Sequence, residues 1–208
     1  SFLARLDDAV YDIVLRSART HSPAGRIVIV DIDERSLSSM GQWAWPRDLV
    51  ARLIAGLRGM GASTIALDIV FAEADRYASG RSSDASPDET LAEALRSGDV
   101  ILGYGLTFET RGTGRGACVL HPVTLPVLWP REETGSTPYF HATGCVCSLP
   151  MLATAAGMSG FLNAAPDADG ILRRVPLVIE LDGQVYPSLA LSAFLASTGA
   201  KDTALRVS

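Results

Sequence analysis

Residues 26–33 read Arg-Ile-Val-Ile-Val-Asp-Ile-Asp, and residues 64–71 read Thr-Ile-Ala-Leu-Asp-Ile-Val-Phe. Both stretches are continuous apolar runs rich in β-branched residues, a pattern typical of strands covered on both faces of a parallel sheet. A third run, Val-Ile-Leu-Gly-Tyr at residues 100–104, has the same character. These three runs predict the strands of a parallel core.

Helical patterns stand between the runs. Pro46 opens a predicted helix at its first position, and Gly59 and Gly61 mark its end. Ser86 and Glu89 have the spacing of a capping box, which predicts a second helix. The order strand, helix, strand, helix, strand favours an α/β fold with three layers and a mostly parallel sheet. The apolar positions of the helix that Pro46 opens are expected to face the core: Leu49, Val50, Leu53, Ile54, Leu57 and Met60.

Further strands are expected near the C-terminus. Residues 160–163 and 175–181 read as strands, and Asp182-Gly183 is a turn signal. We expect these strands to extend the sheet in an antiparallel sense.

Two terminal helices and a long inserted region complete the expected single domain over residues 1–208. Residues 3–19 carry apolar side chains at helical spacing, and residues 187–198 form a last apolar helix. Residues 110–148 are rich in Gly, Pro and Thr and hold all three cysteines. We interpret them as an inserted loop region with some internal order.

Composition excludes several classes of protein. The chain has 208 residues, 48% of them hydrophobic and 20% charged, so general disorder and a disulfide-dense mini-scaffold are excluded. The formal net charge is −5 with no basic block, which argues against a nucleic-acid partner. No apolar run approaches the roughly 20 residues that span a bilayer. Lys201 is the single lysine, which argues against chemistry that needs a buried lysine.

Carboxylates at strand ends are the strongest chemical hint. Asp31 and Asp33 are two residues apart on one predicted strand, and Asp68 follows in the next. The carboxyl ends of parallel strands form the crevice where open sheets bind ligands, and three carboxylates there can hold a divalent cation. The more ordinary alternative is that they cap helices or pair with Arg47. Trp45 and Arg47 either clamp a ligand, or Trp45 covers the sheet edge while Arg47 pairs with one of the three aspartates.

A hydrolase is the alternative from another functional class. The apolar run before Asp31 and Asp33 is similar to the nucleophile loop of haloacid-dehalogenase-like phosphatases, where the first aspartate attacks phosphorus and the second acts as acid and base. That chemistry needs a cationic residue, nearly always lysine, and Lys201 lies in a polar tail. A Gly-x-Ser-x-Gly elbow, a Walker loop and a dinucleotide fingerprint are absent, so no cofactor is expected.

The three cysteines leave several possibilities open. Cys118, Cys145 and Cys147, with His121 and His141, approach the spacing of zinc ligands. In an oxidising compartment a disulfide from Cys118 to Cys145 or Cys147 is favoured, with one cysteine left over. Free thiols are the second reading and zinc the third.

Several segments in order resemble the CHASE2 sensory domain. They include the Asp-Ile-Asp segment at residues 27–37, the Trp-Pro-Arg segment at 41–47 and the Leu-Asp-Ile-Val-Phe segment at 67–71. The remaining segments are Tyr11-Asp12 with Arg16 and Arg19, Gly61-Ala62, and residues 160–163, 167–170, 173–176 and 186–190. Their order and spacing match over nearly the whole chain, whereas residues 110–148 do not follow the family pattern.

The resemblance implies an extracytoplasmic, non-catalytic input domain of a bacterial membrane receptor. Transmembrane helices are expected outside residues 1–208, with residues 1–20 as a membrane-proximal helix, and the chain starts within a helical pattern as an excised piece would. The output beyond the membrane would be a nucleotide cyclase, a histidine kinase or a serine/threonine kinase. The resemblance names no ligand. Strand geometry and the family segments give these candidate contacts for a small molecule: Asp31, Asp33, Trp45, Arg47, Asp68, Asn163 and Arg173.

A homodimer is expected. The N-terminal helix has apolar residues at a spacing that suits a neighbouring helix, which places Leu6, Val10 and Ile13 at or near a two-fold interface.

Overall fold

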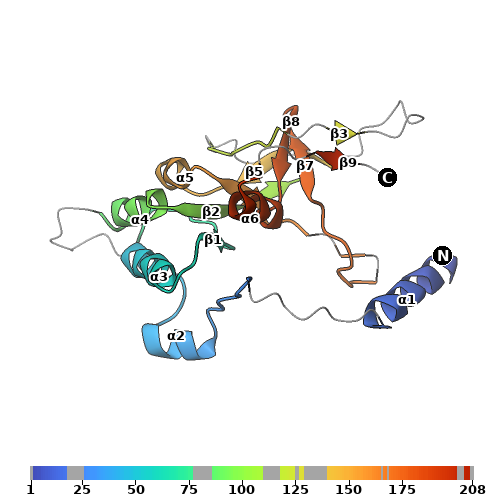
Figure 1. The fold of residues 1–208 in the computed structure, drawn as a ribbon, viewed down its shortest axis with the longest axis horizontal. Coiled ribbons are helices and arrows are strands. Elements are labelled where there is room, and N and C mark those ends of the chain that lie inside the picture. Colours follow the sequence, from blue (N-terminus) through green and yellow to red (C-terminus); the bar gives the residue numbers. More distant parts are fainter. Residues whose placement is uncertain are drawn as a thin grey trace. The chain divides into compact units, whose positions relative to one another are not determined.

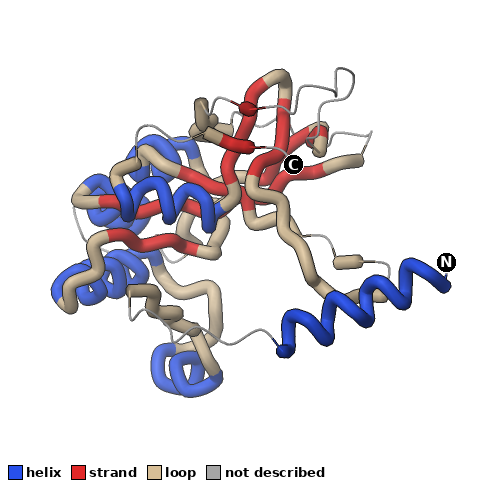
Figure 2. Tube along the Cα trace, turned by 45° about the vertical axis from the view of Figure 1, so that its right-hand side comes forward, coloured by secondary structure: helices blue, strands red, loops and turns tan. Residues whose placement is uncertain are grey.

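The computed structural model describes most of the chain (Figures 1 and 2). The described residues are 2–17, 26–76, 86–109, 118–124, 127–128, 140–164, 166–167, 169–200 and 204–206. The chain divides into two compact units, Ser1–Trp43 and Ala44–Ser208, which are described separately below. That residues 1–208 act as one domain stays a prediction.

The described residues of the first unit include two helices and a stretch without regular structure. Helix α1 (Phe2–Ser17) confirms the predicted N-terminal helix. Helix α2 (Glu34–Met40) was not predicted, and it begins where the Asp33 side chain accepts a hydrogen bond from the Ser36 amide. Residues 26–33 belong to no strand. The prediction of a strand over this run is therefore wrong, and its burial against the sheet stays a prediction.

The second unit is built around a sheet with a long central strand. Strand β2 (Asp99–Thr107) pairs in parallel with β1 (Thr64–Leu67) and with β6 (Ser159–Phe161), and antiparallel with β5 (Gly144–Val146). Strands β1 and β2 confirm two of the predicted parallel strands, although β1 ends at Leu67. The α/β class is confirmed.

Three helices cover one face of this sheet. They are α3 (Arg47–Gly59), α4 (Pro87–Arg96) and α5 (Pro150–Ala156). The capping box of Ser86 and Glu89 is present at the start of α4, as predicted. The buried core between these helices and the sheet includes Val50, Ile54, Ile65, Leu67, Leu91, Leu95, Val100, Leu102 and Leu152. Met60 was expected in this core but is exposed, because α3 ends before it.

Helix α6 (Leu189–Thr198) covers the opposite face. Leu102 belongs to the first core, so Gly103, the next residue of β2, points to the other side. Gly160 pairs with Gly103, and a Cβ atom on Gly160 would lie 2.4 Å from the Leu189 Cα atom. Only a residue without a side chain allows α6 to approach the sheet this closely.

The C-terminal strands form a sheet of their own. Strand β7 (Val178–Leu181) pairs antiparallel with β8 (Gln184–Pro187) and in parallel with β4 (His141–Ala142). The turn between β7 and β8 has positive φ at both Asp182 (51°) and Gly183 (79°), as a two-residue hairpin requires. The predicted strands and turn are confirmed. Within the described residues β7 and β8 belong to a second sheet and do not extend the first one, and β6, which does extend it, pairs with β2 in parallel and not in the expected antiparallel sense. A further short pair joins β3 (Val127–Leu128) to β9 (Leu205–Arg206).

Among the described residues, no helix has both the length and the apolar character needed to cross a membrane.

Candidate functional site

The Arg47 side chain is held in a buried setting at the start of α3. Its Nε atom lies 3.4 Å from Asp88 Oδ1, and its Nη2 atom donates to the Glu73 carbonyl oxygen at 3.0 Å. The guanidinium carbon lies 4.5 Å from the centre of the Phe71 ring. An ion pair, a hydrogen bond and a cation–π contact therefore fix this side chain.

Two buried aspartates connect the first turns of α3 and α4. Asp75 Oδ2 accepts from the Arg47 amide at 2.7 Å, and the Asp75 amide donates to Asp88 Oδ2 at 3.0 Å. Asp88 lies in the first turn of α4. Carboxylates are favourable at helix N-termini, where backbone N–H groups lack partners within the helix. We call Arg47, Phe71, Asp75 and Asp88 the Arg47 cluster.

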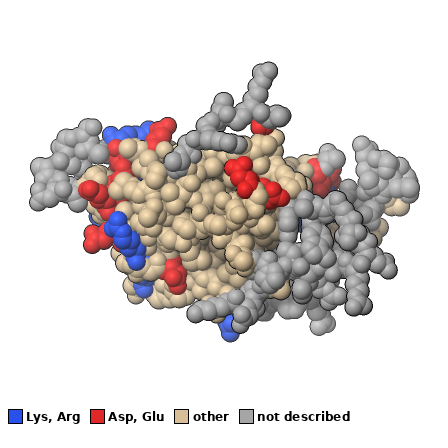
Figure 3. All heavy atoms as spheres, turned by 90° about the horizontal axis from the view of Figure 1, so that it is seen from above, with Lys and Arg blue, Asp and Glu red and all other residues tan. Residues whose placement is uncertain are grey.

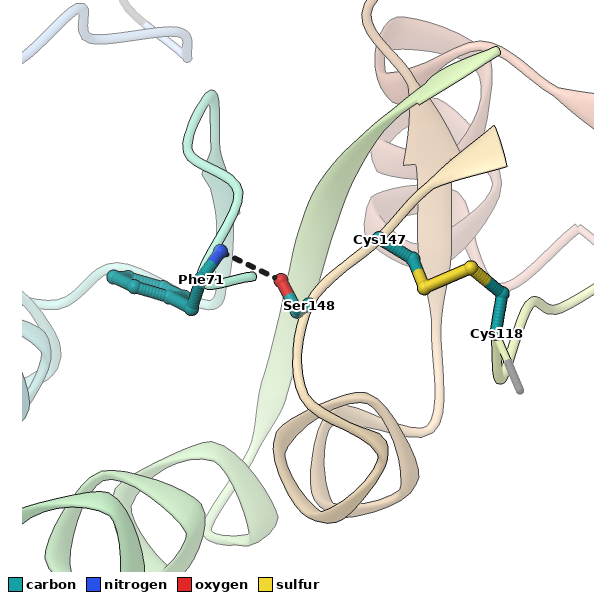
Figure 4. Close-up of a disulfide and its surroundings, with 4 residues drawn as sticks. All are labelled: Phe71, Cys118, Cys147 and Ser148. Atoms are coloured by element: carbon teal, nitrogen blue, oxygen red, sulfur yellow. Dashed lines mark hydrogen bonds between the residues drawn. A yellow bond between two sulfur atoms is a disulfide. The ribbon is translucent and has the colours of Figure 1, made fainter. Parts of the chain in front are cut away.

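A disulfide lies one residue away from a contact of this cluster (Figure 4). Cys118 is bonded to Cys147, and Ser148 Oγ accepts a hydrogen bond of 3.0 Å from the Phe71 amide. The Leu149 amide donates to the Phe71 carbonyl oxygen at 2.8 Å. The segment that carries the disulfide thus fixes the main chain of the residue whose ring faces Arg47.

The predicted site residues do not all have the roles that the sequence suggested. Asp31 and Asp33 are exposed in the first unit, and Asp68 is exposed directly after β1 in the second. Asp33 caps α2, and hydrogen bonds from the Ser36 amide and hydroxyl hold the pKa of its carboxyl below the ordinary value. That matches the ordinary alternative of a helix cap. The convergence of these carboxylates on one ligand stays a prediction.

The partner of Arg47 differs from the expected one. The sequence suggested Asp31, Asp33 or Asp68, whereas the structure pairs Arg47 with Asp88. Trp45 is buried two residues earlier, in agreement with a covering role.

Sequence reasoning missed Asp75 and Asp88 as members of the site. Asp75 lies between the predicted strand at residues 64–71 and the capping box at Ser86, and no local signal marks it as buried. Asp88 stood inside the recognised capping box, so its position at a helix N-terminus was the available signal.

Asn163 has both ends of its amide bonded to one residue. Its Oδ1 atom accepts from the Leu106 amide at 2.7 Å, and its Nδ2 atom donates to the Leu106 carbonyl oxygen at 2.8 Å. Asn163 lies just beyond β6, and its side-chain amide makes with Leu106 of β2 the pair of hydrogen bonds that the main chain of a neighbouring strand would make. This arrangement favours a structural role for Asn163.

Replacing Asn163 by aspartate should destabilise the second unit by about 1–3 kcal/mol, because the carboxylate still accepts from the Leu106 amide but leaves the carbonyl without a donor. Urea unfolding measures the change. Gln184→Glu makes the same amide-to-carboxylate change at an exposed position of β8 and serves as the control. Equal unfolding midpoints for the two variants would contradict the role of Asn163.

Arg173 is the centre of a second ion cluster. Its side chain is 4% exposed, with Nη1 3.1 Å from Asp167 Oδ2 and Nη2 2.7 Å from Asp169 Oδ2. The Gly170 amide donates to the Asp167 carbonyl oxygen, so the acidic segment forms a tight turn. The hydrogen bonds from Arg173 lower the pKa of Asp169 to about 2.

The pH dependence of stability should report this contact. Because the folded pKa of Asp169 lies below the unfolded value, its contribution is present above about pH 4 and is lost as the pH falls toward 2. Asp169→Asn should therefore melt at a lower temperature than the parent chain at pH 6, and the difference should shrink toward pH 2. A difference that is constant between pH 6 and pH 2 would rule out this linkage.

The cysteine and histidine cluster is not arranged as a zinc site in the structure. Cys118 and Cys147 form the disulfide, as one of the expected pairings, and Cys145 is the remaining thiol. Burial raises the pKa of Cys145, while burial lowers the pKa of His121, whose Nδ1 atom lies 3.0 Å from Ser159 Oγ. Within the described ranges, no three His, Cys, Asp or Glu side chains gather as metal ligands.

The ionic groups at Arg47 and Arg173 make contacts within the protein, and a disulfide links Cys118 to Cys147. The CHASE2 domain model matches residues 1–207, and the chain belongs to this family of extracytoplasmic sensory domains, which are generally non-catalytic. No curated protein and no solved structure matches the chain.

Proposed function

We propose that this chain is the signal-input domain of a bacterial membrane receptor, located outside the cytoplasm and without catalytic activity of its own. The match to the CHASE2 model over residues 1–207 carries this proposal. The Cys118–Cys147 disulfide supports it, because disulfides persist in oxidising compartments. Flanking transmembrane helices pass the signal to a nucleotide cyclase, a histidine kinase or a serine/threonine kinase.

The receptor works as a two-fold pair in this proposal. Leu6, Val10 and Ile13 are exposed on α1, and they lie on one face of the helix. Burial of such a stripe against the same helix of a second copy removes apolar surface from water. A stimulus can change the output only if it favours one arrangement of the pair over another.

A small molecule is the proposed stimulus. Of the seven candidate residues, Arg47, Asn163 and Arg173 hold the fold together through their polar groups. Asp31 and Asp68 are exposed carboxylates, each in its own unit. In Figure 3, the described residues of the visible face show separate groups of acidic and basic side chains.

Cysteine cross-linking in the full-length receptor tests the pair. Val10→Cys in a Cys145→Ser background should give a covalent dimer in membranes. Leu15→Cys is the control, because Leu15 is also exposed and apolar but lies on the opposite face of α1. Cross-linking at Leu15 without cross-linking at Val10 would contradict the proposed interface.

A phosphoester panel with magnesium tests the hydrolase alternative on the same protein. Turnover that is lost in Asp31→Asn would overturn the non-catalytic assignment. Asp33 caps α2 in the structure, which gives one of the two aspartates of that alternative a structural role.

A further inference from the structure

The free thiol and the disulfide of the second unit lie at one face of the same strand pair. Cys145 belongs to β5, where it pairs with Leu106 of β2, and Cys147 follows two residues later. Side chains two apart on an extended strand point to the same face, and both cysteines pack against the core that contains Tyr104 and Leu106. Cys118 reaches this face from a third segment and is bonded to Cys147 (Figure 4).

Loop length does not decide which of the two cysteines is bonded to Cys118. The present disulfide joins residues 29 apart, and a bond from Cys118 to Cys145 would close a loop that is only two residues shorter. Because the entropy of a closed loop depends on the logarithm of its length, both cross-links constrain the unfolded chain almost equally. A bond between Cys145 and Cys147 is not available while the strand is extended, because their Cβ atoms are then roughly 6–7 Å apart and a disulfide needs about 4 Å.

We propose that Cys145 exchanges with this disulfide, so that the domain has two covalent forms, Cys118–Cys147 and Cys118–Cys145. The Cys145 thiolate attacks the Cys118 sulfur, the bond from Cys118 to Cys147 breaks, and Cys147 leaves as a thiolate that takes up a proton. One disulfide forms as the other is lost, so the step needs neither an oxidant nor a reductant.

The chain around Cys118 allows the short movement that the exchange requires. Moving from one cysteine of the strand to the other takes the Cys118 sulfur along two strand residues, roughly 7 Å. Leu120 packs against the same core, and Cys118 lies two residues before it, a length of chain that reaches up to about 7 Å. The Val123 amide donates to the Val185 carbonyl oxygen at 2.9 Å, and this bond can stay in place while Cys118 moves.

The groups around Cys145 make the exchange depend on pH. Burial, with the nearby Asp182, raises the pKa of the Cys145 thiol. The titratable groups that act on this thiol or are acted on by it are Tyr104 of β2, Tyr186 of β8 and Asp182 of the turn between β7 and β8. Only the thiolate attacks a disulfide, so each pH unit below that pKa should change the rate by about tenfold, with faster exchange at higher pH.

Tyr104 supplies a hydrogen-bond donor at this face. Its Oη atom is buried and, among the described residues, has no hydrogen-bond partner. Burial, together with Tyr186 and Cys145, raises the pKa of Tyr104, so the hydroxyl keeps its proton while a thiol titrates. A thiolate that forms beside it thus has a donor available.

The exchange changes how the segment that holds Phe71 is attached. Cys147 is tied down by the present disulfide, and the next two residues, Ser148 and Leu149, hydrogen-bond the main chain of Phe71. In the other form Cys147 is released, so the Phe71 ring beside Arg47 is less restrained. The covalent form of the disulfide therefore acts on the Arg47 cluster. The inference concerns the second unit alone and does not depend on the pairing through α1.

Single serine variants of the 208-residue chain separate the two forms. Cys147→Ser leaves Cys118 and Cys145, which should form a disulfide in air and stop reacting with N-ethylmaleimide. Cys118→Ser is the matched control, because it leaves Cys145 and Cys147, which should both stay reactive after unfolding. Folded Cys147→Ser that keeps two reactive thiols after oxidation would overturn the exchange.

The parent chain tests the step without any substitution. After incubation without reductant at about pH 7, 8 and 9, acid quenching and alkylation, fragmentation mass spectrometry should find the label on Cys145 at first and then increasingly on Cys147. The rate should rise about tenfold per pH unit and be independent of protein concentration. Cys145→Ser should take up no label at any of these pH values. A label that stays on Cys145 throughout would overturn the exchange even if Cys147→Ser does not fold.

Amide hydrogen exchange tests the consequence for the Arg47 cluster. The Phe71 and Leu149 amides should exchange about tenfold faster or more in oxidised Cys147→Ser than in Cys145→Ser, because their hydrogen bonds open more often. The Ser192 amide of α6, which donates to the Ser188 carbonyl oxygen, should exchange equally in both. Equal exchange at Phe71 in the two variants would overturn the link between the disulfide and the cluster.

Discussion

Arg47→Ala should lower the free energy of unfolding of the second unit by about 3–5 kcal/mol. The substitution leaves Asp88 buried without its guanidinium partner and removes the contacts with the Glu73 carbonyl oxygen and the Phe71 ring. The hydrogen bond from the backbone amide of residue 47 to Asp75 is retained, so the loss reports the side chain alone.

Arg52→Ala provides the matched control, because Arg52 is an exposed arginine on the same helix. Its effect should stay within about 0.5 kcal/mol, as is usual for surface changes. Guanidinium unfolding followed by tryptophan fluorescence measures both variants. If Arg47→Ala and Arg52→Ala unfold at the same concentration, the Arg47 cluster does not stabilise the fold. Replacing both charges, as in Arg47→Met with Asp88→Leu, should recover part of the loss.

Breaking the Cys118–Cys147 disulfide should cost about 3–4 kcal/mol. The two residues are 29 apart in sequence, and closing a loop of that length removes this much chain entropy from the unfolded state. Cys118→Ser with Cys147→Ser avoids a new free thiol pair, and thermal unfolding measures the change.

Cys145→Ser is the control for the disulfide, because Cys145 is a free cysteine in the same region. It should shift the melting temperature much less than the double serine variant. Reduction with dithiothreitol should destabilise the parent chain and leave the double variant unaffected. Parent chain that melts at the same temperature with and without the reductant would contradict the prediction.

Local patterns in the sequence predicted much of the second unit. The apolar runs gave β1 and β2, the spacing of Ser86 and Glu89 gave the start of α4, and Asp182-Gly183 gave the β-hairpin. Each of these signals acts within a few residues of the element that it specifies.

Pairing between distant segments was harder to predict. The contact of Asp75 with the first turn of α3 joins residues 28 apart, and the clamp of Asn163 on Leu106 joins residues 57 apart. No local pattern tells a buried polar side chain with a distant backbone partner from an exposed one that binds a ligand. The same limit explains why β7 and β8 were expected in the first sheet, and why residues 26–33 were expected to form a strand.

The close approach of α6 to Gly160 restricts which sequences can adopt this fold. A Cβ atom at this position would meet main-chain atoms of Ser188 and Leu189, which cannot move aside as the end of a flexible side chain can. Random mutagenesis of position 160 should therefore return glycine almost alone among folded clones. In related chains, an alanine or serine at the equivalent place would signal that the helix sits farther from its sheet, so a single letter of an alignment would report the spacing between two layers.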